Sequence, residues 1–326
     1  MRLSPTTLSL VLNESPRAAS IPQETKDRIL AAAKHYKYRP NFLGRSLRSQ
    51  RTYTIGVLVP ELSDGYSALV IAGIEDFLLD AGYTYLVTSH RHKQTLLDKY
   101  PQMLYERCVE GLIAVDTPYN DDLPLPMVAV SGHRKAPSVT RILLNHRMAA
   151  GLGLGHLKDF GHRHIAVVRG QDFSSDSKVR WESIRVTAAQ MGIDIHPKLV
   201  AQLSGDNPSP EVGYLAAQQL LSSGRDFTAV FAFNDVSAMG VIRALREAGR
   251  RVPEDVSVVG FDDIQAAAFH IPALTTIRQP LRRMGALAAE VLIQRIVQPG
   301  AALREEIRVE PELVVRESTC AAPVAK

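Results

Sequence analysis

The sequence contains little cysteine and no long hydrophobic run. Only Cys108 and Cys320 occur among the 326 residues, and they lie far apart in the chain. A disulfide-stabilised scaffold is therefore not expected, and a reducing compartment such as the cytoplasm fits this cysteine content. No apolar stretch approaches the roughly 18 residues that a membrane-spanning helix requires, so we expect no membrane association.

Motifs that are typical of several enzyme classes are missing as well. The sequence has no Gly-x-x-x-x-Gly-Lys-Ser/Thr loop, no Gly-x-Ser-x-Gly elbow and no His-Glu-x-x-His pattern. His156, His162 and His164 lie near one another in the sequence, but His162 and His164 alternate at the entry to a strand and are not expected to reach one ion. We therefore expect no enzyme activity, no cofactor and no bound metal.

What is present is the composition of an ordinary globular chain. Hydrophobic residues make up 45% and charged residues 22%, and the chain has 21 Gly and 19 Pro. This composition excludes a disordered or fibrous protein. A length of 326 residues is about twice that of a usual single domain, so two or more packing units are expected.

Positive charge is concentrated at the N-terminus. Residues 1–51 contain ten Lys and Arg against three Asp and Glu, a net charge of +7, whereas the remaining residues carry a net charge of −3. A basic segment attached to an acidic body predicts binding to a polyanion such as DNA, because cationic side chains displace counterions from phosphates. A solvated basic surface without a partner is the alternative.

Three helices are predicted in this basic segment. A Ser-Pro pair at 4–5 is typical of a helix start, and this first helix is expected to end near Asn13. A longer helix is expected to begin at Pro22 and to end at 38–40, where the sequence Tyr-Arg-Pro interrupts it. The third helix, over 41–48, has arginines on one side and leucines on the other.

From residue 53 onward, short apolar runs alternate with helical patterns. The runs suit the central strands of a parallel sheet, which are buried on both faces. Their alternation with helices predicts a doubly wound α/β architecture, with a single eight-unit barrel as the competing topology. The predicted strands are 55–59, 85–88, 112–115, 127–130, 165–168, 229–233 and 257–260, and the predicted helices are 68–79, 148–157, 180–191, 239–248 and 281–297.

A new series of strand and helix units begins after Asn145, so the sheet is expected to be split into two lobes. The C-terminal part of the chain is expected to cross back between them. The predicted segments are, in order, a helical head (1–40), a hinge helix and linker (41–52), the N-terminal lobe (53–145 with about 280–305), the C-terminal lobe (146–279 with about 306–320) and a tail (321–326).

Ordered sequence blocks are spread over nearly the whole chain. They are Thr-Thr-Leu-Ser-Leu-Val-Leu-Asn (6–13), Glu-Thr-Lys-Asp-Arg-Ile-Leu-Ala-Ala-Ala (24–33), Tyr-Arg-Pro-Asn (38–41), Arg-Ser-Leu-Arg-Ser (45–49), Thr-Ile-Gly-Val (54–57), Gly-His-Arg-His-Ile-Ala (161–166), Phe-Asn-Asp (233–235) and Asp-Val-Ser-Val-Val-Gly-Phe-Asp-Asp (255–263). Together they resemble the lactose-repressor/galactose-repressor (LacI/GalR) family of bacterial transcription regulators. A resemblance of this length is far more specific than a single motif.

The resemblance implies that residues 1–40 form part of a helix-turn-helix head whose second helix enters the major groove of operator DNA. Thr6 corresponds to a position that reads bases, and Thr7 and Ser9 correspond to positions that contact the DNA backbone. The family has a further helix where this sequence begins, and Leu10 stands where the family has an arginine that reaches a base. We therefore expect weak, salt-dependent DNA binding with little sequence preference.

The resemblance also implies a hinge helix that enters the minor groove. Leu47 corresponds to the residue that wedges between bases and kinks the DNA. Arg45 and Arg48 are expected to face phosphates, and Asn41 is expected to support the start of the helix. A homodimer is expected, because two-fold dimers bind palindromic half-sites. For Leu47, an ordinary amphipathic helix anchored on the body is the alternative.

For the body, the resemblance implies a periplasmic-binding-protein fold that closes around a small-molecule effector. Arg180 corresponds to the residue that clamps the effector, and Asn234 and Asp262 follow strands at whose carboxyl ends ligands collect. Tyr66 is expected to cover a ring face. Ser67 stands where purine-binding members have a second aromatic residue, so a sugar or sugar derivative is the expected effector. The alternatives are a surface ion pair for Arg180 and a turn cap for Asp262.

These expectations define a cytoplasmic transcriptional repressor that a small molecule controls. The alternative is an exported sugar-binding protein of the periplasmic type, which has the same fold and no role at DNA. The N-terminus imitates a signal peptide only faintly, because its apolar stretch has about five residues where roughly 7 to 15 are needed. The hinge pattern also favours the regulator, since a transport protein has no use for it. An enzyme on this fold, a third class, lacks residues that would carry catalysis.

Overall fold

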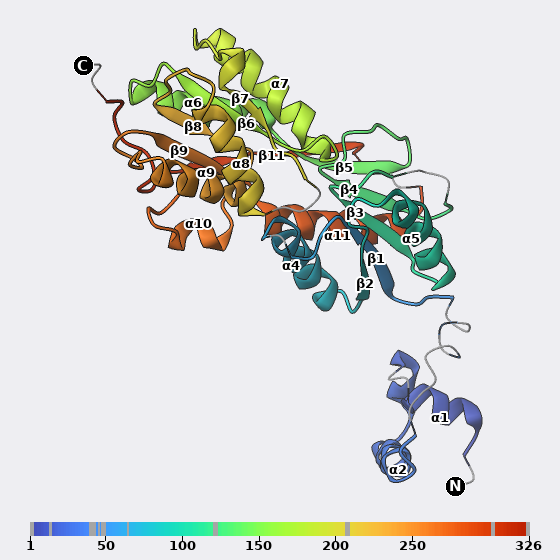
Figure 1. Cartoon of the computed structure of the whole chain (residues 1–326). Coiled ribbons are helices and arrows are strands. Elements are labelled where there is room, and N and C mark those ends of the chain that lie inside the picture. The colour runs from blue at the N-terminus through green and yellow to red at the C-terminus, as the bar shows by residue number, and fades with distance from the viewer. Residues whose placement is uncertain are drawn as a thin grey trace. The chain divides into compact units, whose positions relative to one another are not determined.

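The computed structural model describes residues 3–12, 15–38, 44, 46, 50–63, 65–119, 123–205, 209–300 and 304–323. The chain divides into two compact units, Met1–Thr52 and Tyr53–Lys326 (Figure 1). The division falls at the end of the linker that the sequence predicts over 41–52.

The described part of the first unit contains two α-helices of several residues and a short turn of 3₁₀ helix between them. These elements are α1 (Pro5–Leu12), the 3₁₀ turn (Pro16–Ser20) and α2 (Gln23–His35). Ser4 caps α1, since its Oγ accepts a hydrogen bond of 3.0 Å from the backbone N–H of Thr7. Val11, Ala18 and Ile29 form a small buried core between the elements. The first predicted helix and the longer helix predicted from Pro22 are confirmed as α1 and α2. The hinge helix predicted over 41–48 lies outside the described residues except at positions 44 and 46.

The first lobe of the second unit is a six-stranded sheet in which neighbouring strands run parallel. The strand order is β11-β5-β4-β3-β1-β2. Its elements are β1 (Thr54–Val59), α4 (Gly65–Asp80), β2 (Thr84–Ser89), α5 (Gln94–Glu106), β3 (Gly111–Val115), β4 (Met127–Val130), β5 (Val139–Leu144), α11 (Leu281–Val297) and β11 (Glu306–Val309).

The second lobe is another six-stranded sheet, with the order β12-β10-β9-β8-β6-β7, in which β12 alone runs antiparallel to its neighbour. Its elements are α6 (His146–Asp159), β6 (Ile165–Arg169), α7 (Ser175–Gln190), a 3₁₀ turn (Pro197–Leu199), β7 (Val200–Gln202), α8 (Pro210–Leu221), β8 (Ala229–Phe231), α9 (Asp235–Glu247), β9 (Ser257–Asp262), α10 (Gln265–Phe269), β10 (Thr275–Arg278) and β12 (Glu312–Val314).

Helices cover both faces of each sheet (Figure 1). In the first lobe, α4 and α11 pack on one face through Ile74, Leu78 and Met284, and α5 packs on the other through Leu104. In the second lobe, α6 and α7 cover one face, and α8 and α9 cover the other. The doubly wound α/β architecture is therefore confirmed. The competing single barrel is wrong, because the strands form two separate open sheets.

One predicted lobe boundary is wrong. The segment from residue 306 was assigned to the C-terminal lobe, but β11 pairs with β5 in the first sheet, where Glu306 lies opposite Arg141. The guanidinium of Arg141, which is 5% exposed, donates to the Glu306 carboxylate at 2.8 Å. This buried cation requires its partner carboxylate from the C-terminal segment. The chain returns to the second sheet at β12, after 310–311.

Several elements were missed because their local patterns are weak. Pro101 lies inside α5, and a proline within a helical pattern is normally read as an interruption. β7 and β12 contain three residues each, which is too short for a strand pattern to be recognised. β5 contains Arg141, so it does not form a continuous apolar run.

Each lobe packs one pair of helices at very close range through glycine. In the first lobe, a Cβ on Gly73 of α4 would overlap the carbonyl oxygen of Arg282 in α11, and a Cβ on Gly285 would overlap that of Val70. In the second lobe, Gly213 of α8 and Gly240 of α9 lie equally close to the opposing backbone. Because no side chain separates the two helices of each pair, their backbones are in direct contact.

We expect Gly73→Ala to destabilise the protein by about 1–3 kcal/mol, because the added methyl group forces α4 away from α11. Gly151→Ala in α6 is the matched control. A Cβ there meets no atom within 4 Å, so this change should stabilise the helix by roughly 0.5–1 kcal/mol. Urea unfolding monitored by circular dichroism measures both effects. Equal midpoints for the two variants would contradict the close packing of α4 and α11.

Candidate functional site between the lobes

A cavity lies between the lobes, at the edge where the parallel strands of both sheets end. The space between its atoms, including the part that is open to solvent, is about 530 Å³. The first lobe contributes Pro60, Tyr66, His92 and Asp116, and the second lobe contributes Gln171, Phe173, Ser174, Asp176, Arg180, Phe233, Asn234 and Asp262.

All four effector-binding residues predicted from the sequence line this cavity: Tyr66, Arg180, Asn234 and Asp262. Their role in binding stays a prediction. Tyr66 lies in the first turn of α4, and its hydroxyl is hydrogen-bonded to the Ser131 hydroxyl at 2.7 Å. Burial, together with the nearby carboxylates of Asp176 and Asp116, raises the pKa of Tyr66 well above its usual value, so the hydroxyl keeps its proton.

Arg180 is held more firmly than its sequence pattern indicates. It is 4% exposed, and its guanidinium carbon lies 4.4 Å from the ring centre of Phe233 and 3.7 Å from that of Phe261. Its Nη1 donates to the carbonyl oxygen of Phe233, and its Nη2 donates to Asp176 at 3.4 Å. Two of its nitrogen atoms are therefore engaged within the protein. The alternative of a surface ion pair is wrong, because the side chain is buried.

Asn234 and Asp262 occupy strand ends of the second lobe. Asn234 caps α9, since its Oδ1 accepts a 2.9 Å hydrogen bond from the N–H of Ser237 and the Ser237 hydroxyl completes a capping box. Asp262 ends β9 with a φ of 111°, a backbone conformation that is strained for any residue other than glycine. Its Oδ1 accepts a 2.7 Å hydrogen bond from Gln279.

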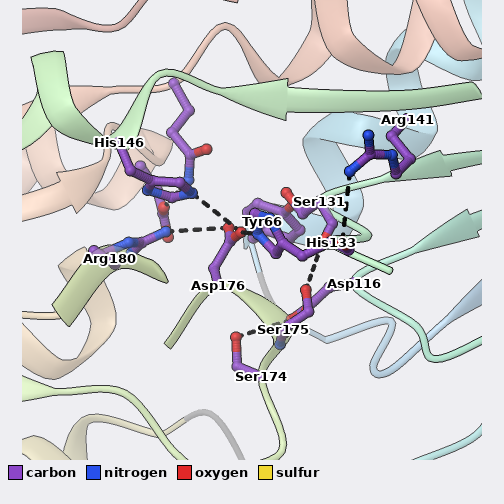
Figure 2. A network of polar contacts seen from close by, with 12 residues as sticks. Tyr66, Asp116, Ser131, His133, Arg141, His146, Ser174, Ser175, Asp176 and Arg180 are labelled. Atoms are coloured by element: carbon purple, nitrogen blue, oxygen red, sulfur yellow. Dashed lines mark hydrogen bonds and ion pairs between the residues drawn. The ribbon is translucent and has the colours of Figure 1, made fainter. Parts of the chain in front are cut away.

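The buried carboxylate of Asp176 connects both lobes (Figure 2). It accepts hydrogen bonds from His133 at 2.6 Å and from His146 at 3.1 Å on Oδ1, and from Arg180 at 3.4 Å on Oδ2. His133 follows β4 of the first lobe, whereas Asp176 lies in α7 of the second. Burial by itself raises the pKa of Asp176, but its neighbours His146, His133 and Arg180 outweigh burial and hold this pKa well below the usual value.

Asp116 makes a second polar connection between the lobes. Directly after β3, it accepts hydrogen bonds from the backbone N–H of Ser175 at 3.0 Å, from the Ser175 hydroxyl at 2.6 Å and from the Ser174 hydroxyl at 3.3 Å (Figure 2). Burial, and then repulsion by Asp176, raises the pKa of Asp116 from 3.8 to about 7. At neutral pH the carboxyl group of Asp116, which joins the lobes, is therefore protonated in only part of the molecules.

An aromatic contact closes one side of the cavity. The rings of His92 and Phe173 lie 3.7 Å apart with an interplanar angle of 30°. His92 follows β2 of the first lobe and Phe173 precedes α7 of the second. The two side chains therefore form an apolar cover that joins the lobes.

Four polar residues at the junction of the lobes were not predicted from the sequence: Asp116, His133, His146 and Asp176. A signal existed for Asp116, because it follows the apolar run 112–115 at the carboxyl end of a parallel strand. For the other three, nothing in the local sequence distinguishes them from surface residues. Their proximity arises from three separate loops and helix starts.

The predicted DNA-binding residues belong to the first unit. Thr6 is exposed on α1, and the Thr7 hydroxyl is hydrogen-bonded to the Ser4 hydroxyl at 2.8 Å. Ser9 is half-buried on the same helix. Asn41, Arg45, Leu47 and Arg48 lie outside the described residues. The role of all seven in DNA binding stays a prediction.

A two-lobed α/β body with a polar cavity between its lobes is the architecture of binding proteins of the periplasmic type. Residues 154–319 match the family of periplasmic binding protein-like domains. Among the described helices, there is none that is both long and apolar enough to span a membrane.

Comparisons over the whole chain add the regulator class. The chain is 33% identical to the HTH-type transcriptional repressor PurR of Photobacterium profundum over 324 residues, which cover 97% of this chain and 95% of that protein. It is 31% identical to PurR of Haemophilus influenzae over 327 residues, with the same shares of both chains covered.

Solved structures agree with these relatives. The Lac repressor dimer bound to operator and the anti-inducer ONPF aligns with a TM-score of 0.84 and 26% identity, over 98% of this chain and 96% of that one. The transcriptional regulator CelR in complex with cellobiose aligns with a TM-score of 0.75 and 26% identity, over 97% of this chain and 96% of that one.

The chain therefore belongs to the LacI/GalR family of bacterial transcriptional regulators. The predicted function, a DNA-binding regulator that a small molecule controls, is confirmed at the level of this class. The alternative of a transport protein is not supported, because the relatives are HTH-type repressors.

We expect Asp116→Asn to flatten the pH dependence of stability. The pKa of Asp116 is raised from 3.8 to about 7, so between these values the folded protein holds a proton that the unfolded chain releases. The stability that this group contributes is therefore fully present below its unfolded pKa and is lost as the pH rises to about 7. The variant has no carboxyl group to lose the proton. Urea unfolding at several pH values measures the difference between variant and parent.

Asp159→Asn, at the exposed end of α6, makes the same change of charge in solvent and is the matched control. The comparison between variants also cancels other titrating groups, such as His90, whose pKa is lowered by burial to about 4. Identical pH profiles for the two variants would contradict a raised pKa at Asp116.

Proposed function

We propose that this protein represses transcription from an operator in the cytoplasm, and that a sugar or sugar derivative bound between its lobes controls the repression. The observation that carries this proposal is the cavity itself, because polar and aromatic side chains from both lobes converge on it. A ligand in this position contacts both lobes and therefore favours one arrangement of the lobes over another. The relatives are repressors, so we propose a regulatory role without catalysis.

The charges around the cavity favour a neutral, hydroxyl-rich ligand. The carboxyl groups of Asp116, Asp176 and Asp262 line the cavity together with the guanidinium of Arg180, and all four groups also have partners within the protein. Carboxylates accept hydrogen bonds from hydroxyl groups and repel phosphate or carboxylate groups. The cellobiose that the related regulator CelR binds is such a neutral sugar.

Aromatic side chains complete the chemistry of a sugar site. Tyr66, Phe173 and Phe233 line the same cavity. Their apolar ring faces suit the C–H side of a pyranose or furanose ring, while the carboxylates bind its hydroxyl groups. An anionic effector would be repelled by the carboxylates.

Self-association is part of the proposal. Phe269 at the end of α10 is 79% exposed and Ile271 is 77% exposed, so the second lobe presents large apolar side chains to solvent. Exposed apolar patches of this kind are typical of association surfaces. The related Lac repressor was solved as a dimer bound to operator.

We expect Asn234→Ser to weaken effector binding roughly fivefold, which corresponds to the loss of one hydrogen bond of about 1 kcal/mol. Serine keeps the capping role at the start of α9, so the fold is retained. Asn145→Ser is the matched control, because Asn145 caps α6 in the same way and is not among the residues that line the cavity. Titration calorimetry with neutral sugars, sugar phosphates and purine bases measures the affinities.

If a ligand is found and Asn234→Ser and Asn145→Ser bind it equally well, Asn234 does not contact the effector. Tight binding of a sugar phosphate or a purine base in preference to every neutral sugar would contradict the proposed effector class.

The head is expected to have only a small sequence preference, and we expect Thr6→Ala to remove it: binding to the preferred DNA site should fall by up to about tenfold, because a contact to a base edge is worth roughly 1–3 kcal/mol. Thr25→Ala on α2 makes the same chemical change elsewhere in the head and should leave binding unchanged. The preferred site is first selected from a random duplex pool with the parent protein at low salt, where phosphate contacts are strongest. Fluorescence anisotropy then gives the affinities.

Scrambled duplexes separate the two kinds of contact. Thr6→Ala should lower affinity for the selected site and leave the affinity for scrambled DNA unchanged, since phosphate contacts carry no sequence information. Equal losses on both duplexes would show that Thr6 contacts the DNA backbone instead of a base.

A further inference from the structure

The side chains of His133, His146 and Asp176 converge at the junction of the lobes (Figure 2). The Nε2 atoms of the two histidines lie 2.6 and 3.1 Å from the same Asp176 oxygen, and the three atoms all lie within 4.8 Å of one another. In a tetrahedral metal site with bonds of about 2.0–2.1 Å, neighbouring ligand atoms lie roughly 3.3 Å apart. The cluster therefore has close to the spacing that three ligands of one ion need.

From this geometry we propose that His133, His146 and Asp176 bind a divalent transition-metal ion, of which Zn²⁺ is the representative. Two imidazole nitrogens and one carboxylate oxygen form a donor set that suits Zn²⁺, Ni²⁺ or Cu²⁺. Mg²⁺ and Ca²⁺ prefer oxygen ligands and are not expected to bind. Asp176 also lines the effector cavity, so the ion would lie at the wall of that cavity.

The neighbours of the cluster hold its ligand atoms in place. Arg180 donates to Oδ2 of Asp176, which leaves Oδ1 directed at both imidazoles. Hydrogen bonds of this kind orient the carboxylate ligands of metal sites. Nη1 of Arg141 donates to the carbonyl oxygen of His133 at 3.5 Å and thereby fixes the segment that carries this histidine. Arg180 adds a positive charge nearby, so the affinity is expected to be moderate.

Access and hydrogen bonding also agree with an ion site. The side chain of His133 is 22% exposed, which provides a route from solvent, whereas those of His146 and Asp176 are buried. In this structure two imidazoles share one carboxylate oxygen, Oδ1 of Asp176.

An ion at this position would join the lobes. His133 belongs to the first lobe and Asp176 to the second, so the bonds to the metal would hold the cavity closed. Asp176 also lines the cavity, so the open coordination position is available to water or to a hydroxyl group of a bound molecule. The metal would therefore stabilise the closed arrangement of the lobes, in addition to any effector that is bound there.

The test uses the full chain and Zn²⁺ alone, without effector or DNA, so its outcome does not depend on the proposed function. Metal-free protein is titrated with Zn²⁺ by calorimetry, and with Co²⁺ by visible absorption, which reports nitrogen and oxygen ligands in a distorted site. The variants are His133→Gln and His146→Gln. His164→Gln, an exposed histidine of the second lobe, is the matched control.

We expect one Zn²⁺ per chain, an affinity at least tenfold weaker in His133→Gln and His146→Gln, and an unchanged affinity in His164→Gln. Zn²⁺ should also raise the melting temperature of the parent and the control but not of the two cluster variants. His133 is partly exposed and outside regular structure, so His133→Gln keeps the test valid if His146→Gln does not fold.

Parent protein that takes up no stoichiometric Zn²⁺ would overturn the proposal. Equal affinity of the parent and His133→Gln would also overturn it, because the ion would then lie elsewhere. A loss in His164→Gln equal to that in His133→Gln would indicate surface binding only and would have the same consequence.

Discussion

In a parallel sheet the chain must cross back over one face after every strand, so all strands end at the same edge. Both lobes of this protein are built on such sheets, and the residues that line the cavity follow strands of each one. The position of the site is a consequence of this constraint. Asp116, Ser131 and Asp262 have positive φ angles at these strand ends. Backbone strain of this kind is common where side chains must turn towards a ligand.

Charge compensation around Asp176 converts the meeting of the lobes into a specific contact. A lone buried carboxylate is costly, and this one is surrounded by Arg180 from its own helix, His146 at the start of α6 and His133 from the opposite lobe. Separating the lobes removes His133 and exposes the carboxylate. A molecule that competes for Asp176, or an ion that binds it, therefore changes the free energy of closure. The carboxyl group of Asp116 also lies between the lobes, but its pKa is raised, so the free energy of closure depends on whether this group is protonated.

Much of the fold was accessible from the sequence, because local patterns carry it. Continuous apolar runs such as 55–59 and 112–115 are strands that are buried on both faces. The weak point was the C-terminal segment, where β11 belongs to the first sheet. β11 pairs with β5, where Arg141 needs the Glu306 carboxylate, and these two residues are more than 150 positions apart in the sequence. No local period contains that information.

The sequence by itself determined the class of protein, the alternation of strands and helices, and the strand ends at which Asn234 and Asp262 lie. These features depend on periodicity and on ordered motifs, which are local properties of the chain. The tertiary structure alone decided that Arg180 is stacked between Phe233 and Phe261, and that His133, His146 and Asp176 meet. Three segments that are separated along the chain have no local reason to contain matching groups. They meet because two sheets end at one cleft, where a buried carboxylate needs partners from both sides.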